Sequence, residues 1–440
     1  MKTIRICAPC VLLFLAAHPM IAAEPRPGEI VFKADFEGPK ALDAWQPSKQ
    51  EHVGLAPGCA GLQSVLVERT VAEGPGHRTI RVGLPVEKLR GTRVRVEGMI
   101  RAEGVAKPPN AWNGIKCMLH FVSPSDQQWL QQNNLHGTFD WKPVRFVADV
   151  PEDAKEASLI LGLEETTGWA CFDRVAVIVK RALPIRPATP PVGPVYKGHD
   201  LPRLRGTMIS PQVTDADLRV LGGQWKANHV RWQLLWGGFP KSPADKGDLA
   251  AYDAWLESAL KHLDRLLPVC DELGIKVLID LHTPPGGRNE SSECRMFHEA
   301  RFQEAFVQVW DKIARRYRGN KTVWGYDLVN QPLEGLVEDG MLDWQALATR
   351  AAKQVRMIDP DHAIIIEPAP WGGPGALKNF EPIPVPGVVY SVHAYMPFQF
   401  THQGIYGNPT GVSYPGAVQG KRWDKDELPR ALRPGKQSPR

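Results

Sequence analysis

Polar side chains with the chemistry of a binding or catalytic site follow five short apolar runs in the second half of this 440-residue chain. In chain order they are Arg231, His282, Asn330 with Gln331, Glu367, and His393 with Tyr395. Arginine lowers the pKa of a neighbouring carboxylate, and histidine changes its protonation state near neutral pH. A single histidine at such a place is often structural, but the ordered set indicates one cleft that binds or activates a substrate.

The elements that must position these groups alternate between strands and helices from about residue 200. Apolar runs, typical of parallel strands covered on both faces, occupy 204–209, 229–235, 275–281, 323–329, 363–366 and 388–392. Between them, apolar residues recur at helical spacing over 252–266, 302–317 and 344–355. This alternation predicts an α/β sheet or barrel with right-handed crossovers, in which the carboxyl ends of the strands open onto one face.

The ordered set resembles glycoside hydrolase family 5, the cellulase and mannanase group on a TIM-type (β/α) barrel, over about residues 200–400. Arg231 and His282 match the arginine and the histidine that end the family's second and third strands. Asn330 matches the asparagine of the Asn-Glu-Pro at strand four, and His393 with Tyr395 matches the His-x-Tyr at strand six. The resemblance implies retaining hydrolysis of β-linked glycans, which needs two carboxyl groups about 5–5.5 Å apart.

The resemblance also implies a partner and roles for individual residues. The partner is a polysaccharide or oligosaccharide of the endo-β-1,4-glucanase substrate class, and tryptophans near strand ends, such as Trp236 and Trp371, stack on sugar faces. The implied substrate-binding residues are Arg231, His282, Asn330, Trp371, His393 and Tyr395. No cofactor is expected, and no metal, because these histidines lack the paired spacings of zinc ligands.

Two departures from the family pattern predict that this chain is inactive or impaired. Gln331 occupies the position of the general acid/base, and an amide cannot supply a proton there. Losing general acid catalysis alone removes about 10²–10⁴ in rate, or about 3–5 kcal/mol of transition-state stabilisation. In addition, only about six of the eight strands can be counted, so we expect an incomplete barrel, truncated at the C-terminus, without the strand that carries the nucleophile.

Another carboxylate could substitute for the missing ones. The candidates are Glu334, Glu338 and Glu367, with Glu290, Glu293 and Glu299 in the loop after His282. Because Glu367 ends a strand, we expect it to be paired with a nearby cation or bound to substrate, whereas Glu334 is expected to face solvent. Two other functions stay open: a non-catalytic glycan-binding protein that keeps the cleft, and a truncated product that folds poorly.

Residues 27–182 are predicted to form an all-β sandwich ahead of the barrel. Apolar and charged residues alternate over 93–101, as in a half-buried strand, and about eight short runs are separated by glycine, proline and aspartate. Segments 32–37 and 169–175 weakly resemble the first and last strands of jelly-roll carbohydrate-binding modules. Trp112, Trp129 and Trp141 could form a sugar-stacking surface or belong to the core. Five prolines within 183–199 predict a linker between the domains.

The first 23 residues have the build of a secretory signal peptide, with a basic start, a short apolar centre and Ala22-Ala23 at the end. A membrane anchor is the alternative, but the apolar run is too short to span a bilayer. The sequence therefore predicts a secreted or periplasmic protein without a membrane partner. A net charge of only +5 argues against a nucleic-acid partner, and we expect a monomer.

Overall fold

The computed structural model describes residues 26–47, 51–124, 127–184, 195–236 and 247–432. The chain divides into two compact units, Met1–Ala182 and Leu183–Arg440. The predicted signal peptide, 1–23, lies outside the described residues, as does most of the predicted linker (185–194). Among the helices that are described, none has the length and apolar character needed to cross a membrane.

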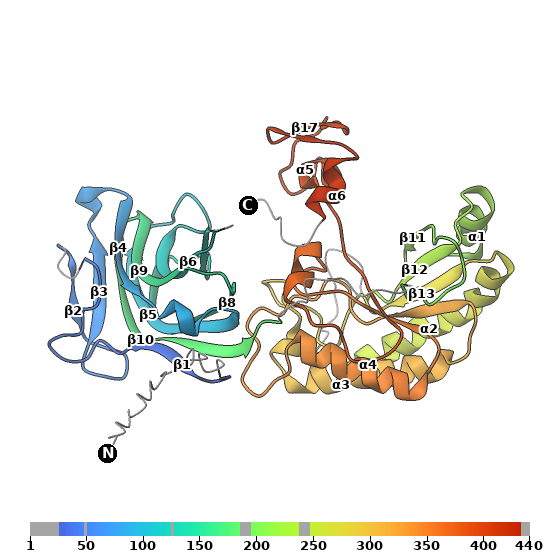
Figure 1. Ribbon diagram of the computed structural model, residues 1–440, viewed down its shortest axis with the longest axis horizontal. Coiled ribbons are helices and arrows are strands. Elements are labelled where there is room, and N and C mark those ends of the chain that lie inside the picture. The colour runs from blue at the N-terminus through green and yellow to red at the C-terminus, as the bar shows by residue number, and fades with distance from the viewer. Residues whose placement is uncertain (1–25, 48–50, 125–126, 185–194, 237–246, 433–440) are drawn as a thin grey trace, which may run out of the picture. The chain divides into compact units, whose positions relative to one another are not determined.

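The first unit is built from two antiparallel sheets, which confirms the all-β prediction (Figure 1). One sheet has the order β2 (Val53–Ala56), β3 (Ser64–Arg69), β10 (Gly168–Ala182), β5 (Thr92–Val105) and β8 (Gly137–Val150), with β1 (Ile30–Ala34) paired to β10. The other has the order β4 (Gly76–Gly83), β9 (Glu156–Thr166), β6 (Gly114–Val122) and β7 (Gln127–Gln131). Two short 3-10 helices, η1 (Val71–Glu73) and η2 (Val86–Lys88), lie between strands.

Apolar residues at alternating positions along the strands form the core of this unit. In β5, Val94, Val96 and Ile100 are fully buried, and in β9 Leu159 and Leu161 are fully buried as well. All five belong to one hydrophobic cluster, to which both sheets contribute. Fully burying such a side chain stabilises the fold by about 1.5–3 kcal/mol. The two sheets therefore pack face to face over a shared apolar interior, as a sandwich requires.

The second unit contains a sheet of six parallel strands in chain order, each paired with the next. They are β11 (Gly206–Ile209), β12 (His229–Gln233), β13 (Lys276–Asp280), β14 (Val323–Asp327), β15 (Ala363–Ile366) and β16 (Val388–Tyr390). The strands β13 to β15 are almost wholly buried, as the apolar runs predicted. The structure thus has the strand–helix alternation of a TIM barrel, but no closed barrel forms from the described residues.

Helices connect consecutive strands and bury an apolar face against them. The long ones are α2 (Leu249–Glu272), α3 (Ala300–Tyr317) and α4 (Trp344–Ile358), which lie along one side of the sheet in Figure 1. Helix α2 begins where the carboxylate of Asp248 accepts hydrogen bonds from the N–H groups of Ala250 and Ala251, and it ends just before Gly274, which has a φ of +67°. Gly274 thus follows the helix in a conformation that glycine accepts without strain.

The remaining elements of the second unit are short. They are α1 (Asp215–Arg219), the π-helix η3 (Val220–Gln224), the 3-10 helices η4 (Arg295–Phe297) and η5 (Pro374–Asn379), α5 (Phe398–Thr401), the hairpin β17 (Gly416–Val418) with β18 (Lys421–Trp423), and α6 (Glu427–Ala431). The hairpin forms a separate two-stranded sheet. Strands β11 and β16 are therefore the two edges of the six-stranded sheet within the described part of the chain.

Candidate active site

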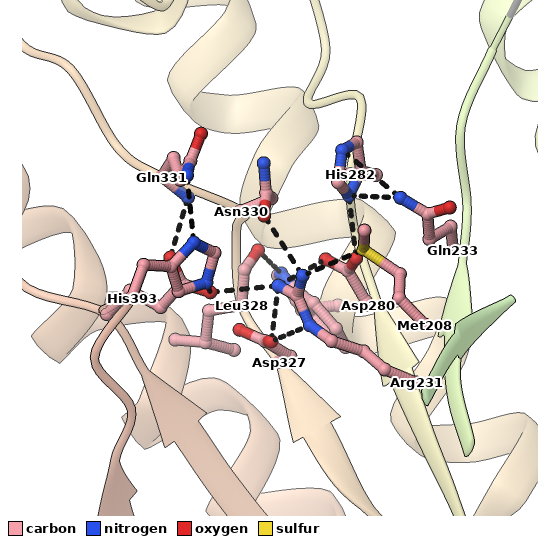
Figure 2. A network of polar contacts seen from close by, with 12 residues as sticks. Met208, Arg231, Gln233, Asp280, His282, Asp327, Leu328, Asn330, Gln331 and His393 are labelled. Carbon is pink, nitrogen blue, oxygen red and sulfur yellow. Dashed lines mark hydrogen bonds and ion pairs between the residues drawn. The ribbon is translucent and has the colours of Figure 1, made fainter. Parts of the chain in front are cut away.

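The carboxyl ends of the parallel strands bring the polar residues of the second unit together (Figure 2). Arg231 lies in β12, and Asp280 and Asp327 are the last residues of β13 and β14. Glu367 directly follows β15, and His393 comes shortly after β16. Neighbouring parallel strands end at the same edge of a sheet, so residues far apart in sequence contact one another here.

Arg231 is the centre of this cluster. Its Nε donates to Asp327 Oδ2 at 2.9 Å, its Nη1 to Asn330 Oδ1 at 3.0 Å and its Nη2 to Glu367 Oε1 at 2.8 Å. Nη2 also lies 3.1 Å from Asp280 Oδ1. The side chains of Asp280 and Glu367 are 0% exposed, so one guanidinium neutralises buried carboxyl groups and orients the Asn330 amide at the same time.

The single positive charge of Arg231 does not balance the three carboxyl groups that it contacts. Burial raises the pKa of Asp327 well above its ordinary value; Arg231 opposes the shift, and repulsion from Glu367 and Asp280 adds to it. Burial also disfavours charge on Arg231, but attraction to Asp327, Asp280 and Glu367 outweighs it and raises the arginine pKa. The arrangement therefore favours the charged form of Arg231 and disfavours ionisation of Asp327.

His282 lies beside this cluster, next to Asp280. Its Nδ1 is 2.7 Å from Asp280 Oδ2, and Gln233 Nε2 is 3.1 Å from the same ring nitrogen. Gln233 ends β12 two residues after Arg231, so both side chains point to the same face of the strand. Sequence reasoning singled out His282 but assigned no role to Gln233, Asp280 or Asp327, although their place at strand ends was visible.

Gln331 and His393 meet on the other side of Arg231 (Figure 2). Gln331 Nε2 lies 2.8 Å from His393 Nδ1, and His393 Nε2 lies 2.8 Å from Glu367 Oε1. The backbone N–H of Gln331 donates to Glu367 Oε2 at 2.7 Å. Glu367 is therefore paired with Arg231 and His393, which is one of the two roles the sequence suggested for it.

Two aromatic rings named from the sequence lie partly open to solvent in the same region. Trp371 is 43% exposed and its ring faces the guanidinium of Arg288, 5.7 Å away; Tyr395 is 44% exposed, with its ring centre 6.1 Å from that of His393. Trp236 instead stacks on Trp255 of α2 at 5.5 Å, which occupies one face of its ring. Trp371 and Tyr395 are thus more exposed to solvent than Trp236, which is half-buried.

Three of the other carboxylates considered from the sequence, Glu334, Glu293 and Glu299, have structural partners. Glu334 is 8% exposed and accepts a hydrogen bond from the backbone N–H of Trp344 at 2.6 Å, so the expectation that it faces solvent is wrong. Its carboxylate caps the first turn of α4, where unpaired N–H groups attract an anion. Glu293 pairs with His298 and Glu299 with Arg295. Among the described residues, no group of three side chains is arranged to hold a metal ion.

Comparison with known proteins places this geometry in context. A family model for cellulases, glycosyl hydrolase family 5, matches residues 195–428. Endoglucanase C of Acetivibrio thermocellus is 29% identical over 171 residues, which are 37% of this chain and 49% of the relative. Cellodextrinase A of Ruminococcus flavefaciens is 27% identical over 191 residues, 42% of this chain and 55% of the relative. The chain thus spans about half the length of these curated relatives.

Solved structures also match part of the chain. A crystal structure described as a glycoside hydrolase is 24% identical with a TM-score of 0.41, covering 52% of this chain and 72% of that one. Endoglucanase Cel5A from the hyperthermophilic Thermotoga maritima is 26% identical with a TM-score of 0.34, covering 46% of this chain and 64% of its own.

Proposed function

The chain belongs to glycosyl hydrolase family 5, the cellulase family, and from that membership we propose that its cleft binds β-linked polysaccharide of the β-1,4-glucan class. The site supports this in two ways. Arg231 fixes the Asn330 amide in a position to bind a sugar hydroxyl, and the exposed rings of Trp371 and Tyr395 offer apolar faces beside it. Two of the relatives with the matching segment are named Endoglucanase C and Cellodextrinase A.

We further propose that hydrolysis by this chain is absent or severely impaired. The observation that carries this proposal is the side chain of residue 331, an amide that binds His393 where the family's retaining mechanism needs a proton donor. The three carboxyl groups around Arg231 do not replace it. Asp280, Asp327 and Glu367 are each 0% exposed, so none of them can reach an anomeric carbon in the cleft.

A non-catalytic glycan-binding protein is the second candidate function. It is favoured by the hydrogen bond between Gln331 and His393, because the amide keeps the polar lining of the cleft while removing the acid. An amide has nearly the shape of a carboxyl group, so contacts that bind sugar hydroxyls can survive the substitution.

We propose that the first unit also contacts polysaccharide, through Trp112 and Trp129. These rings are 57% and 53% exposed, and the segments that carry them are in contact, since Gln131, two residues after Trp129 in β7, donates to the carbonyl oxygen of Trp112 at 2.6 Å. Trp141 lies in β8 of the other sheet. A secreted or periplasmic location is part of the same proposal, since polysaccharide is met outside the cytoplasm.

Two assays of the purified protein test the proposed function. Incubation with carboxymethylcellulose or mannan should release no reducing ends above background, and isothermal titration with cellotetraose should show saturable binding. Clear turnover would overturn the proposed impairment. Failure to bind any cello- or manno-oligosaccharide would overturn the glycan-binding cleft itself.

A further inference from the structure

We propose that Glu367 and Arg288 are positioning residues that together hold residue 331 in a left-handed backbone conformation facing the cleft. The inference rests on the proposed function only for the choice of ligand. Neither residue is exposed in the manner of a substrate contact, since Glu367 is 0% exposed and Arg288 half-buried. Both act through the main chain of the segment after β14.

Residue 331 adopts a backbone conformation that glutamine does not prefer. Its φ is +48°, in the left-handed region, where a side chain with a Cβ crowds the backbone. Such a conformation persists only where several surrounding contacts hold it in place. Residues held in this way are often found at functional sites. The contacts around Gln331 must therefore account for it.

Glu367 supplies one half of these contacts. Its Oε2 accepts the N–H of Gln331 at 2.7 Å, while its Oε1 accepts from Arg231 and lies 2.8 Å from His393 Nε2. An ionised carboxylate only accepts hydrogen bonds, so the His393 proton is on Nε2, and Nδ1 then accepts from the Gln331 amide at 2.8 Å. One carboxylate thus fixes both the backbone and the side chain of residue 331.

Arg288 supplies the other half. Its Nη2 donates to the carbonyl oxygens of Asn330 at 2.8 Å and Gln331 at 2.9 Å, and its guanidinium faces the ring of Trp371. The N–H of Trp371 in turn donates to the carbonyl oxygen of Pro332 at 2.9 Å. Arg288 therefore connects the loop after β13, the segment after β14 and the exposed ring of Trp371.

The absence of a side chain at Gly372 permits this arrangement. A Cβ at residue 372 would lie 2.7 Å from Glu367 Oε2, the oxygen that binds the Gln331 N–H, and the φ of Gly372 is +64°. Glycine is the residue that accepts both the close approach and the conformation. Glycine at residue 372 therefore leaves room for the Glu367 carboxylate to reach the N–H of Gln331.

The test uses the full chain and the variants Glu367→Gln and Arg288→Lys, with Glu381→Gln and Arg203→Lys as exposed matched controls. Whichever way the new amide at 367 turns, its NH2 group faces a donor, so either the Gln331 N–H or the His393 Nε2–H loses its acceptor. Arg288 also donates through Nη1 to the carbonyl oxygen of Ser292 at 2.9 Å, and lysine at 288, with one nitrogen in place of two, cannot keep that bond together with both bonds of Nη2. We expect each variant, but neither control, to weaken cellotetraose binding about tenfold, equal to about 1.4 kcal/mol.

Readouts that do not need the ligand separate this proposal from the proposed function. Imidazole nitrogen NMR of the wild type, with His393 assigned through His393→Asn, should show the Nε2–H tautomer. Hydrogen exchange of the Gln331 amide should accelerate about tenfold in Arg288→Lys, and Glu367→Gln should change that exchange or the tautomer. An Nδ1–H tautomer in the wild type, or variants that leave amide exchange, tautomer and affinity unchanged, would overturn the proposal. If the wild type does not bind cellotetraose, only the proposed function fails.

Discussion

The chemistry of the second unit depends on which groups in a buried polar cluster carry protons. Arg231 contacts three carboxyl groups that are 0% exposed, and Gln331 meets His393 through an amide. In glycosidases two carboxyls act as acid and nucleophile, and each must reach the sugar. Here the carboxyls bind Arg231 and His393, and at the residue scale our proposal is that the cluster orders the strand ends without supplying an acid.

Restoring glutamate at residue 331 tests this interpretation. We expect Gln331→Glu to release no reducing ends from carboxymethylcellulose above the background of the wild type, because Asp280, Asp327 and Glu367 stay buried and no attacking carboxylate is gained. Gln331→Ala serves as the matched control for the assay background. A rise of tenfold or more in Gln331→Glu would show that one of the buried carboxyls, or another group, attacks the sugar.

The raised pKa of Asp327 predicts a pH dependence of stability. A carboxyl group whose pKa is higher in the folded than in the unfolded state favours folding most below its unfolded pKa, and this contribution is lost as pH rises through the folded pKa. Relative to Asp327→Asn, which cannot ionise, the wild type should therefore lose stability as pH rises above the ordinary aspartate range. Urea unfolding from pH 4 to pH 8 measures it, with exposed Asp200→Asn as control. A constant difference across this range would contradict the prediction.

Strands and helices place this cluster, and most of them could be predicted because their pattern is strong. The apolar runs of β12 to β15 and the helical spacing of α2 to α4 each bury a continuous surface, which leaves a clear periodic signal. The strands missed were β2, which has four residues, β7, a polar edge strand rich in glutamine, and the three-residue strands β17 and β18 of the hairpin. Burial of the residues in these strands depends on the strands beside them, and the spacing of apolar residues within a short segment does not show it.

Some of the site residues could likewise be predicted from the sequence, and others could not. Arg231, His282, Asn330 and His393 were recognised from their order after apolar runs, and the structure brings them to one edge of the sheet. Asp280 and Asp327 also end apolar runs, but no motif of the resemblance pointed to them, and their contacts with Arg231 join residues distant in sequence. Glu334 was misjudged because capping of α4 depends on a turn ten residues away in sequence.

Helix α4 contacts the candidate site through Trp344, and this contact predicts an effect on the free energy of unfolding. This side chain is 1% exposed and its Nε1 donates to the carbonyl oxygen of Glu367 at 2.7 Å. Trp344→Phe removes that bond and leaves a cavity, so it should lower the free energy of unfolding by about 2–4 kcal/mol. Urea unfolding should show it, while Trp225→Phe, at a position 73% exposed, should stay within about 0.5 kcal/mol of wild type. Equal effects of the two substitutions would contradict the packing described.

At the scale of the whole molecule, two compact units each carry aromatic side chains exposed to solvent. In the first unit Trp112 and Trp129 lie near β6 and β7, and in the second Trp371 and Tyr395 lie at the polar cluster. Each unit also has its own large hydrophobic cluster of buried residues. Shared sugar-binding chemistry would explain why one chain carries both units.

Binding to insoluble cellulose tests the part played by the first unit. The double substitution Trp112→Ala with Trp129→Ala should reduce retention of the full chain on microcrystalline cellulose at least about fivefold, because exposed rings supply the apolar contact. Affinity for soluble cellotetraose should stay the same. Trp225→Ala, an exposed ring of the second unit, is the control. Unchanged retention would show that the first unit has another role.

A single NMR sample tests the central claim that the polar strand ends form a glycan-binding cleft without effective catalysis. Saturation-transfer difference spectra of cellotetraose with the purified protein report binding, and the anomeric proton signals of the same sample report hydrolysis over a day. We predict transfer to the sugar protons with anomeric intensities that stay constant. Absence of transfer, or steady growth of new reducing-end signals, would contradict the account.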